Sequence, residues 1–194
     1  AGKLVGELPY LWGRPQQEPL GASYRWSHRE ALAQAVSEGK GVMLLTPHLG
    51  CFEVTAQAYA QQYGQGRGEA SKPMTVLYRP PRKAWLTELV THARRRPGLS
   101  TAPTSMAGVK QLIKALKGGE CVGLLPDQVP PAGQGVWSPF FGRNAYTMTL
   151  AVRLALQTKA TVLVAWGERL AIGRGYTVHV SPLPAHAGGG LAPD

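Results

Sequence analysis

Short apolar runs alternate with longer amphipathic stretches through most of this chain. The apolar runs predict strands at 41–46, 74–78, 122–125, 161–166 and 176–180. In the other stretches, apolar positions recur at the spacing of a helix face and predict helices at 27–39, 52–63, 84–95, 105–118 and 147–158. Strands that alternate with helices are typical of layered α/β proteins. We therefore expect one α/β domain with a largely parallel or mixed sheet flanked by helices.

Local signals mark two of the helix starts. Ser27 and Glu30 fit a capping box, in which each side chain bonds the backbone N–H of the other residue. Ser105 precedes a second helix, and the apolar face of that helix carries Val109, Leu112, Ile113 and Leu116. Both serines are therefore expected to begin helices.

The two ends of the chain lack such periodicity. Residues 1–24 are rich in proline and tryptophan, and we expect an irregular segment there. The glycine-rich end predicts a flexible tail at 184–194, which leaves 25–183 as the folded domain. Within that domain, 129–146 is expected to be a long loop. Because the sequence begins at Ala1 and ends in the glycine-rich tail, we expect it to be truncated at both ends.

Composition and charge narrow the classes of partner. The chain has 194 residues, of which 44% are hydrophobic, enough for one domain with a sizeable core. Its 21 Lys and Arg residues outnumber its 11 Asp and Glu residues, for a formal net charge of +10. Such a surplus favours an anionic partner, whether a membrane surface, an acidic protein or nucleic acid. No run has the length of a membrane span.

The cysteines and histidines give no sign of a metal site. Cys51 and Cys121 have no metal-ligand spacing and are expected to be free thiols in a reducing compartment. No third ligand recurs beside a histidine and carboxylate pair, so we predict no bound metal.

The most suggestive chemistry lies in the turn after the first predicted strand, with the sequence TPHLGCFE. Pro47 and Gly50 can form a turn that brings His48 near Glu53, on the first turn of the next helix. A histidine held by a carboxylate is a general base for a hydroxyl, and we predict this role for the pair. Cys51 leaves a second mechanism open, because a thiolate at a helix N-terminus can be a nucleophile.

Other polar side chains follow the ends of predicted strands. Arg79 follows the second strand, and Arg82 lies in the same proline-containing turn. Asp127 and Gln128 come just after the third strand. Ligands bind beyond the carboxyl ends of strands in such sheets, so His48, Arg79 and Asp127 could share one crevice. The arginines would suit a phosphate group. Asp127 and Gln128 would hydrogen-bond a substrate or position Arg79; simple turn chemistry at Pro126 and Asp127 is the alternative interpretation.

Four blocks of sequence together carry a family resemblance. They are TPHLGCFE, TVLYRPPRKAWL, GLLPDQ and GVWSPFFGRNAYTMTLAVRLA, and they occur in order within about 31–180. They resemble blocks of the lipid A biosynthesis acyltransferases, the late lauroyl and myristoyl transferases of the lysophospholipid acyltransferase superfamily. The first block resembles the His-x4-Asp/Glu motif of that family, and TVLYRPPRKAWL is similar to a block whose arginine helps to bind substrate.

The resemblance implies an acyltransferase-like domain that moves a fatty acyl chain from acyl carrier protein or coenzyme A to a hydroxyl of a lipid A precursor. His48 would take the proton of that hydroxyl while Glu53 orients the ring, and the oxygen would attack the thioester without an acyl-enzyme. No cofactor beyond the acyl donor is implied. An anionic membrane surface is a further expected partner, and the expected location is the cytoplasmic face of the bacterial inner membrane.

The fourth block adds aromatic and cationic candidates. By the same resemblance, Phe140, Phe141 and Arg143 are expected to line a site for the acyl chain and a phosphate. A plain hydrophobic lid over the sheet is the alternative interpretation of these residues.

Two other functions remain open at this point. Another acyltransferase of the superfamily could use coenzyme A thioesters and a different glycerolipid or glycolipid acceptor, and donor preference would separate the two. A basic lipid-binding or nucleic-acid-binding module without activity is the non-enzyme alternative. No recognised nucleic-acid motif supports the last of these.

Overall fold

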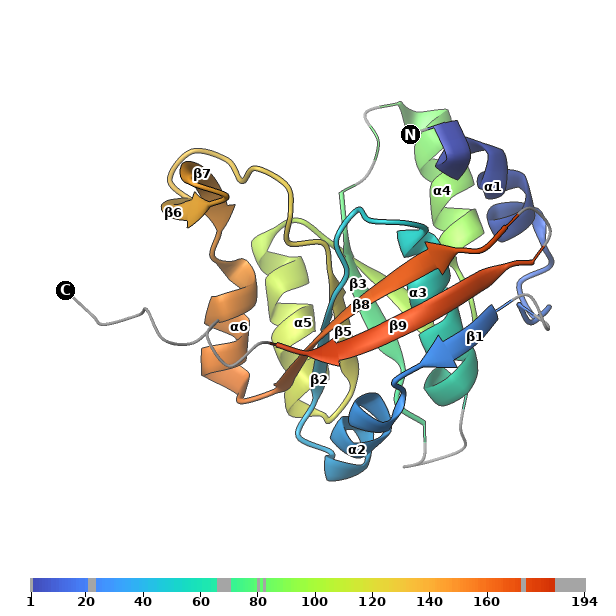
Figure 1. The fold of residues 1–194 in the computed structure, drawn as a ribbon, viewed down its shortest axis with the longest axis horizontal. Coiled ribbons are helices and arrows are strands. Elements are labelled where there is room, and N and C mark those ends of the chain that lie inside the picture. Colours follow the sequence, from blue (N-terminus) through green and yellow to red (C-terminus); the bar gives the residue numbers. More distant parts are fainter. Residues whose placement is uncertain are drawn as a thin grey trace.

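A seven-stranded sheet runs through the part of the molecule that the structure describes (Figure 1). The structure is a computed structural model, and it describes residues 2–20, 24–65, 71–79, 81, 83–171 and 174–183. The strands lie in the order β1-β9-β8-β2-β5-β3-β4, and every neighbouring pair is parallel except β8 with β9. The predicted α/β class, with a largely parallel or mixed sheet, is confirmed.

The sheet consists of β1 (Tyr24–Ser27), β2 (Val42–Leu45), β3 (Met74–Tyr78), β4 (Leu99–Pro103), β5 (Cys121–Leu124), β8 (Thr161–Arg169) and β9 (Tyr176–Pro182). A separate antiparallel hairpin is formed by β6 (Gly135–Phe140) and β7 (Arg143–Met148). The helices are α1 (Gly2–Gly13), α2 (Glu30–Glu38), α3 (Phe52–Tyr59), α4 (Ala84–Arg94), α5 (Met106–Lys117) and α6 (Leu150–Thr158). A π-helical turn, η2 (Ala60–Gly64), extends α3.

Strand β2 shows why the central strands are continuous apolar runs. Successive side chains of a strand point to opposite faces of the sheet. Leu44 packs with buried residues of α2 and α3, whereas Met43 packs with buried residues of α5 and α6. Both faces of β2 are therefore covered, and neither face tolerates the polar alternation of a half-exposed strand.

Helix α5 forms where the sequence predicts it, but α2 begins differently. The Ser105 hydroxyl accepts a hydrogen bond from the backbone N–H of Gly108 at 3.4 Å, as an N-cap does. The capping box predicted at Ser27 is wrong, because Ser27 ends β1 and α2 has Arg29 as its N-cap with no side-chain cap. Ser27 instead pairs with His179 of β9 as part of the sheet, so it is not available to cap the helix.

The N-terminal segment also differs from its prediction. Helix α1 forms there in place of an irregular chain, although Pro9 lies inside it. Leu11 is fully buried, and the backbone carbonyl of Leu11 accepts hydrogen bonds from both Gln57 and Arg96. Tertiary packing of the helix outweighs the local cost of the proline, which the sequence pattern alone does not reveal.

The interval expected to be a loop contains the β6–β7 hairpin, which projects from the sheet above α5 and α6 (Figure 1). Its turn uses Phe141 and Gly142, both with positive φ, as type I′ hairpin turns require. Strand β4 was likewise not predicted, because its sequence LSTAP has little apolar character. The expected tail at 184–194 lies outside the described residues.

None of the helices in the described part of the chain has both the length and the apolar character needed to cross a membrane.

Candidate active site

The candidate site begins with two neighbouring parallel strands. Leu45 of β2 is the register partner of Leu124 of β5. His48 and Asp127 each lie three residues beyond that pair. The segments that follow β2 and β5 therefore leave the sheet side by side. The two residues are 79 positions apart in the sequence, and the register alone brings them together.

Asp127 holds the imidazole of His48 through both of its oxygens. One oxygen lies 2.8 Å from ring Nδ1, and the other accepts a hydrogen bond from the His48 backbone N–H at 2.7 Å. The side-chain amide of Gln128 donates toward ring Nε2 at 3.4 Å. Both contacts imply the same neutral tautomer, with the proton on Nδ1 and the lone pair on Nε2. A lone pair held in this way is what a general base needs.

The charge of Asp127 is stabilised by this arrangement. Partial burial of the carboxyl group opposes its ionisation, but the hydrogen bonds from the ring and backbone N–H groups of His48 outweigh it. The pKa of Asp127 therefore lies below its ordinary value. A negative charge beside Nδ1 stabilises the imidazolium that forms when Nε2 takes a proton.

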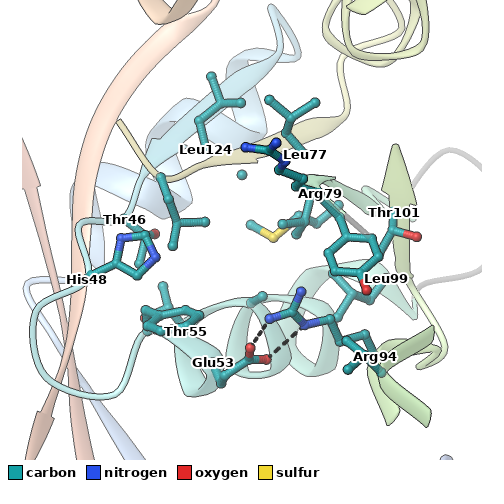
Figure 2. A pocket seen from close by; sticks show the side chains of 18 of the residues that line it. Thr46, His48, Glu53, Thr55, Leu77, Arg79, Arg94, Leu99, Thr101 and Leu124 are labelled. Atoms are coloured by element: carbon teal, nitrogen blue, oxygen red, sulfur yellow. Dashed lines mark hydrogen bonds and ion pairs between the residues drawn. The ribbon is translucent and has the colours of Figure 1, made fainter. Parts of the chain in front are cut away.

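A cavity of about 360 Å³ opens beside the His48 ring (Figure 2). This volume is within the usual range for small-molecule sites. Its wall between the helices and the sheet is mainly apolar and includes Met74, Val76, Leu77, Val90, Leu99, Leu124 and Met148. The polar groups around it include His48, Gln128, Arg79, Thr101 and Glu53. The cavity thus offers a base at one side and room for an apolar chain.

Glu53 lines the same cavity, but its partner is Arg94 of α4 and not His48. The Arg94 guanidinium forms an ion pair with the Glu53 carboxylate, and its Nε donates to the second carboxylate oxygen at 3.4 Å. Arg94 also lies over the ring of Tyr78, 5.0 Å from its centroid. Figure 2 shows this pair across the cavity from the imidazole. The structure therefore brings Asp127, rather than Glu53, to the histidine.

The turn that carries His48 is attached to β8 through backbone contacts at Gly50. Gly50 has φ +63 and forms a bridge with Gly167 of β8. The next backbone N–H, that of Cys51, donates to the Gly167 carbonyl at 2.7 Å. A side chain on Gly50 would collide with that carbonyl. Glycine is therefore required at position 50 of this turn, because two backbones approach closely here.

Cys51 is placed as a packing residue. Its side chain is fully buried, and burial raises the pKa of the thiol to about 12. The thiol stays protonated at neutral pH and is not a cavity-lining group, which argues against a thiolate nucleophile.

The remaining predicted site residues separate into three groups. Arg79 and Gln128 line the cavity. Arg82 lies outside the described residues. Phe140, Phe141 and Arg143 do not line the cavity, because they form the exposed tip of the hairpin.

Sequence reasoning missed the groups at the far side of the cavity. Arg94 closes a helix and gives no local sign of its pairing with Glu53, which is 41 positions away. The Thr55 hydroxyl, the Tyr78 hydroxyl and the Trp12 indole N–H are buried there with no hydrogen-bond partner among the described residues. The parallel register of β2 and β5 is the signal that would have linked Asp127 to His48.

Comparison with known proteins agrees with the resemblance seen in the sequence blocks. The sequence model of a family described as bacterial lipid A biosynthesis acyltransferase matches residues 1–186. A curated protein of Haemophilus influenzae (strain ATCC 51907 / DSM 11121 / KW20 / Rd), named lipid A biosynthesis acyltransferase, is 29% identical over 134 residues. The match covers 69% of this chain and 39% of that relative, so the chain spans well under half of its length.

Proposed function

Because this chain belongs to the bacterial lipid A biosynthesis acyltransferase family, we propose that it transfers a fatty acyl chain from an acyl thioester to a hydroxyl of a lipid A precursor. The observation that carries this proposal is the His48 ring, held by Asp127 at the edge of a largely apolar cavity.

In the proposed mechanism, His48 Nε2 takes the proton of the acceptor hydroxyl. The oxygen attacks the thioester carbonyl, and the negative charge of the resulting tetrahedral intermediate lies on the former carbonyl oxygen. Collapse of the intermediate forms the ester and breaks the C–S bond, and His48 returns its proton to the leaving thiolate. General base catalysis of this kind is worth about 10²–10⁴-fold in rate. No covalent acyl-enzyme is needed.

Two carboxylates receive different roles in this proposal. Asp127 orients the imidazole and stabilises its cationic form, because it already accepts from Nδ1. Glu53, predicted from its spacing to orient the ring, acts through Arg94 instead and fixes the opposite wall of the cavity. The apolar wall would hold the acyl chain, and the exposed Arg79 at its edge would contact a phosphate of the donor or acceptor.

The partners follow from the same chemistry. The donor would be an acyl group on acyl carrier protein or on coenzyme A, and the formal net charge of +10 suits either of these anionic carriers. The acceptor would be an anionic lipid, and the proposed location of the reaction is the cytoplasmic face of the bacterial inner membrane.

A donor and acceptor assay tests the proposal. Purified protein is incubated with a defined lipid A precursor and with matched acyl thioesters of acyl carrier protein or coenzyme A, and the products are identified by mass spectrometry. We expect a mass increase of one acyl group with at least one donor, and a loss of about 10²-fold or more in rate for His48→Ala. Transfer by His48→Ala at the rate of the unaltered protein would refute the role of the histidine.

A further inference from the structure

Large apolar side chains are exposed at the end of the molecule where β2, β3, β4 and β5 finish, close in sequence to residues that line the cavity. We call them the apolar rim, and they are Leu49, Trp85, Met106, Val129, Val136, Trp137, Phe140 and Phe141. The rim comes from separate connections, because four members follow β2, β3, β4 and β5 and the rest lie on the β6–β7 hairpin. Figure 1 shows the hairpin and the start of α4 at this same end.

The rim adjoins the cavity directly. Leu49 is the residue after His48, and Val129 is the residue after Gln128; both His48 and Gln128 line the cavity. Met106 lies two residues beyond another lining residue, Thr104. Three of the exposed apolar side chains therefore lie within two residues of groups that line the cavity.

The opposite end of the sheet has a different surface. Among the described residues of the connections that lead into β2, β3, β4, β5 and β8, no large apolar side chain is exposed. Lysines occur there instead, including Lys40 and Lys159. Both ends of the molecule carry cations, and at the rim the exposed apolar side chains lie on the same segments as the exposed cations Arg79, Lys83 and Arg143.

The tip of the hairpin combines strain with exposure. Phe141 has φ +48, a conformation that is costly for a bulky side chain and that asparagine or glycine adopts more easily. The side chain is 94% exposed and contacts the neighbouring Phe140 ring, with the ring centroids 4.8 Å apart, so almost no burial compensates for the strain. A bulky apolar residue in such a place suits a contact with something outside the folded chain.

The hairpin also lacks a buried face. Trp137 and Phe140 lie on opposite faces of the same strand, since they are three residues apart, and both are exposed. An isolated two-stranded hairpin is marginally stable in water. An apolar environment in contact with both faces would stabilise the hairpin.

We propose that the apolar rim inserts into the surface of an anionic lipid bilayer, so that the cavity opens toward the lipid from which its acceptor comes. This inference rests on the proposed function for the identity of that acceptor. Scattered apolar side chains from separate loops form no groove for one peptide or helix, whereas a bilayer surface accepts them together. Exposed tryptophans suit the interfacial region, and the neighbouring cations suit anionic headgroups.

Vesicle sedimentation without any acyl donor tests the inference. Purified protein is mixed with vesicles of phosphatidylcholine, or of phosphatidylcholine with phosphatidylglycerol. We expect binding to the anionic vesicles, weakened about tenfold or more in the double variant Phe140→Ser and Phe141→Asn, because two apolar rings leave the lipid. Asparagine suits the positive φ at position 141, so the single variant Phe141→Asn should fold at least as well and still bind more weakly.

A matched control separates position from hydrophobicity. Leu156, in the last turn of α6, is 61% exposed, against 62% for Phe140, and it lies toward the opposite end of the sheet. Leu156→Gln should bind vesicles as the unaltered protein does. Equal binding by the unaltered protein and the double variant, or equal losses in the double variant and Leu156→Gln, would overturn the inference.

Two further outcomes keep this inference distinct from the proposed function. His48→Ala should bind vesicles normally, so that failure of acyl transfer leaves membrane binding testable. The hairpin double variant should bind acyl carrier protein as tightly as the unaltered protein in the absence of lipid. Weakened binding to the carrier with unchanged vesicle binding would assign the rim to a protein partner and overturn the bilayer proposal.

Discussion

At the scale of single residues, the chemistry depends on how Asp127 satisfies two donors. The ring N–H and the backbone N–H of His48 each face one carboxylate oxygen. A carboxylate accepts both bonds without rearrangement, and its charge favours protonation of the opposite ring nitrogen during turnover. The site therefore requires a group that accepts two hydrogen bonds from His48, and an acid merely near the histidine would not be enough.

Asp127→Asn should therefore be severely impaired. An amide offers one acceptor oxygen to two donors, so either its NH₂ group faces an N–H or the ring changes tautomer and loses the lone pair on Nε2. We expect kcat to fall about 10²–10⁴-fold with little change in KM. Gln128→Ala is the control, with a loss below about tenfold, since its contact with Nε2 is 3.4 Å long. Steady-state kinetics would contradict the assignment if Glu53→Gln lowered kcat strongly and Asp127→Asn did not.

The same carboxylate should affect stability in acid. The pKa of Asp127 is lower in the folded protein than its ordinary value, so the folded state favours the charged form. The resulting stabilisation is present above the ordinary pKa and is lost as the pH falls through the lower, folded value. Urea unfolding from about pH 5 downward should show a larger loss for the unaltered protein than for Asp127→Asn. Parallel pH profiles would contradict this.

Single residues also show which parts of the site can be predicted from the sequence. His48, Asp127, Gln128 and Arg79 are predictable as neighbours, because each follows an apolar strand and such strands end at one edge. The partner of the ring is not predictable from spacing. Glu53 lies five residues from His48 and resembles a partner in the sequence, but the strand register supplies a nearer carboxylate from 79 positions away.

At the scale of elements, the site is a set of connections held at fixed distances by packing and ion pairs. The Glu53–Arg94 pair joins α3 to α4 across the cavity, and the Gly50–Gly167 contact joins the β2–α3 turn to β8. Strongly periodic helices such as α5 are predictable, whereas β1 and β4 depend on pairing with strands elsewhere in the sequence and the hairpin depends on the pairing of β6 with β7. Local propensity carries little information about such pairing.

Removal of Arg94 should destabilise the protein. Arg94→Ala leaves the buried Glu53 carboxylate without its cation, and we expect the free energy of unfolding to fall by about 3 kcal/mol. Because both charges leave together in Glu53→Leu with Arg94→Met, that double variant should recover part of the loss. Lys40→Ala, which breaks an exposed pair with Glu38, should cost less than about 1 kcal/mol. Urea denaturation measures all three, and equal losses for the two ion pairs would contradict this account.

The glycine contact gives a second test at this scale. Gly50→Ala places a methyl group against the Gly167 carbonyl at a positive φ, so both stability and acyl transfer should fall, with more than about 1 kcal/mol lost from unfolding. Gly133 has φ +79 with open space around it, and Gly133→Ala carries the conformational cost alone. Chemical denaturation and rate measurements would show a similar effect of the two variants if the close contact did not matter.

At the scale of the whole molecule, the two ends of the sheet have different surfaces. The carboxyl ends of the parallel strands carry His48, the cavity and the apolar rim, whereas the opposite connections carry no exposed large apolar group among their described residues. Net charge predicts an anionic partner but does not say which end meets it. The α/β class predicts the end that carries the chemistry, and only the fold places the exposed aromatic hairpin beside it.

The strand register that joins His48 to Asp127 also affects when the site appears during synthesis. Everything from α3 to α5 separates the two residues, so the ribosome must complete β5 before the imidazole can meet its carboxylate. Closure of so long a segment has an entropic cost that is recovered only after the strands pair. In a nascent chain that stops short of β5, the His48 ring would therefore lack the carboxylate that orients it. The proposed acyl transfer would become possible only late, when the central sheet has formed.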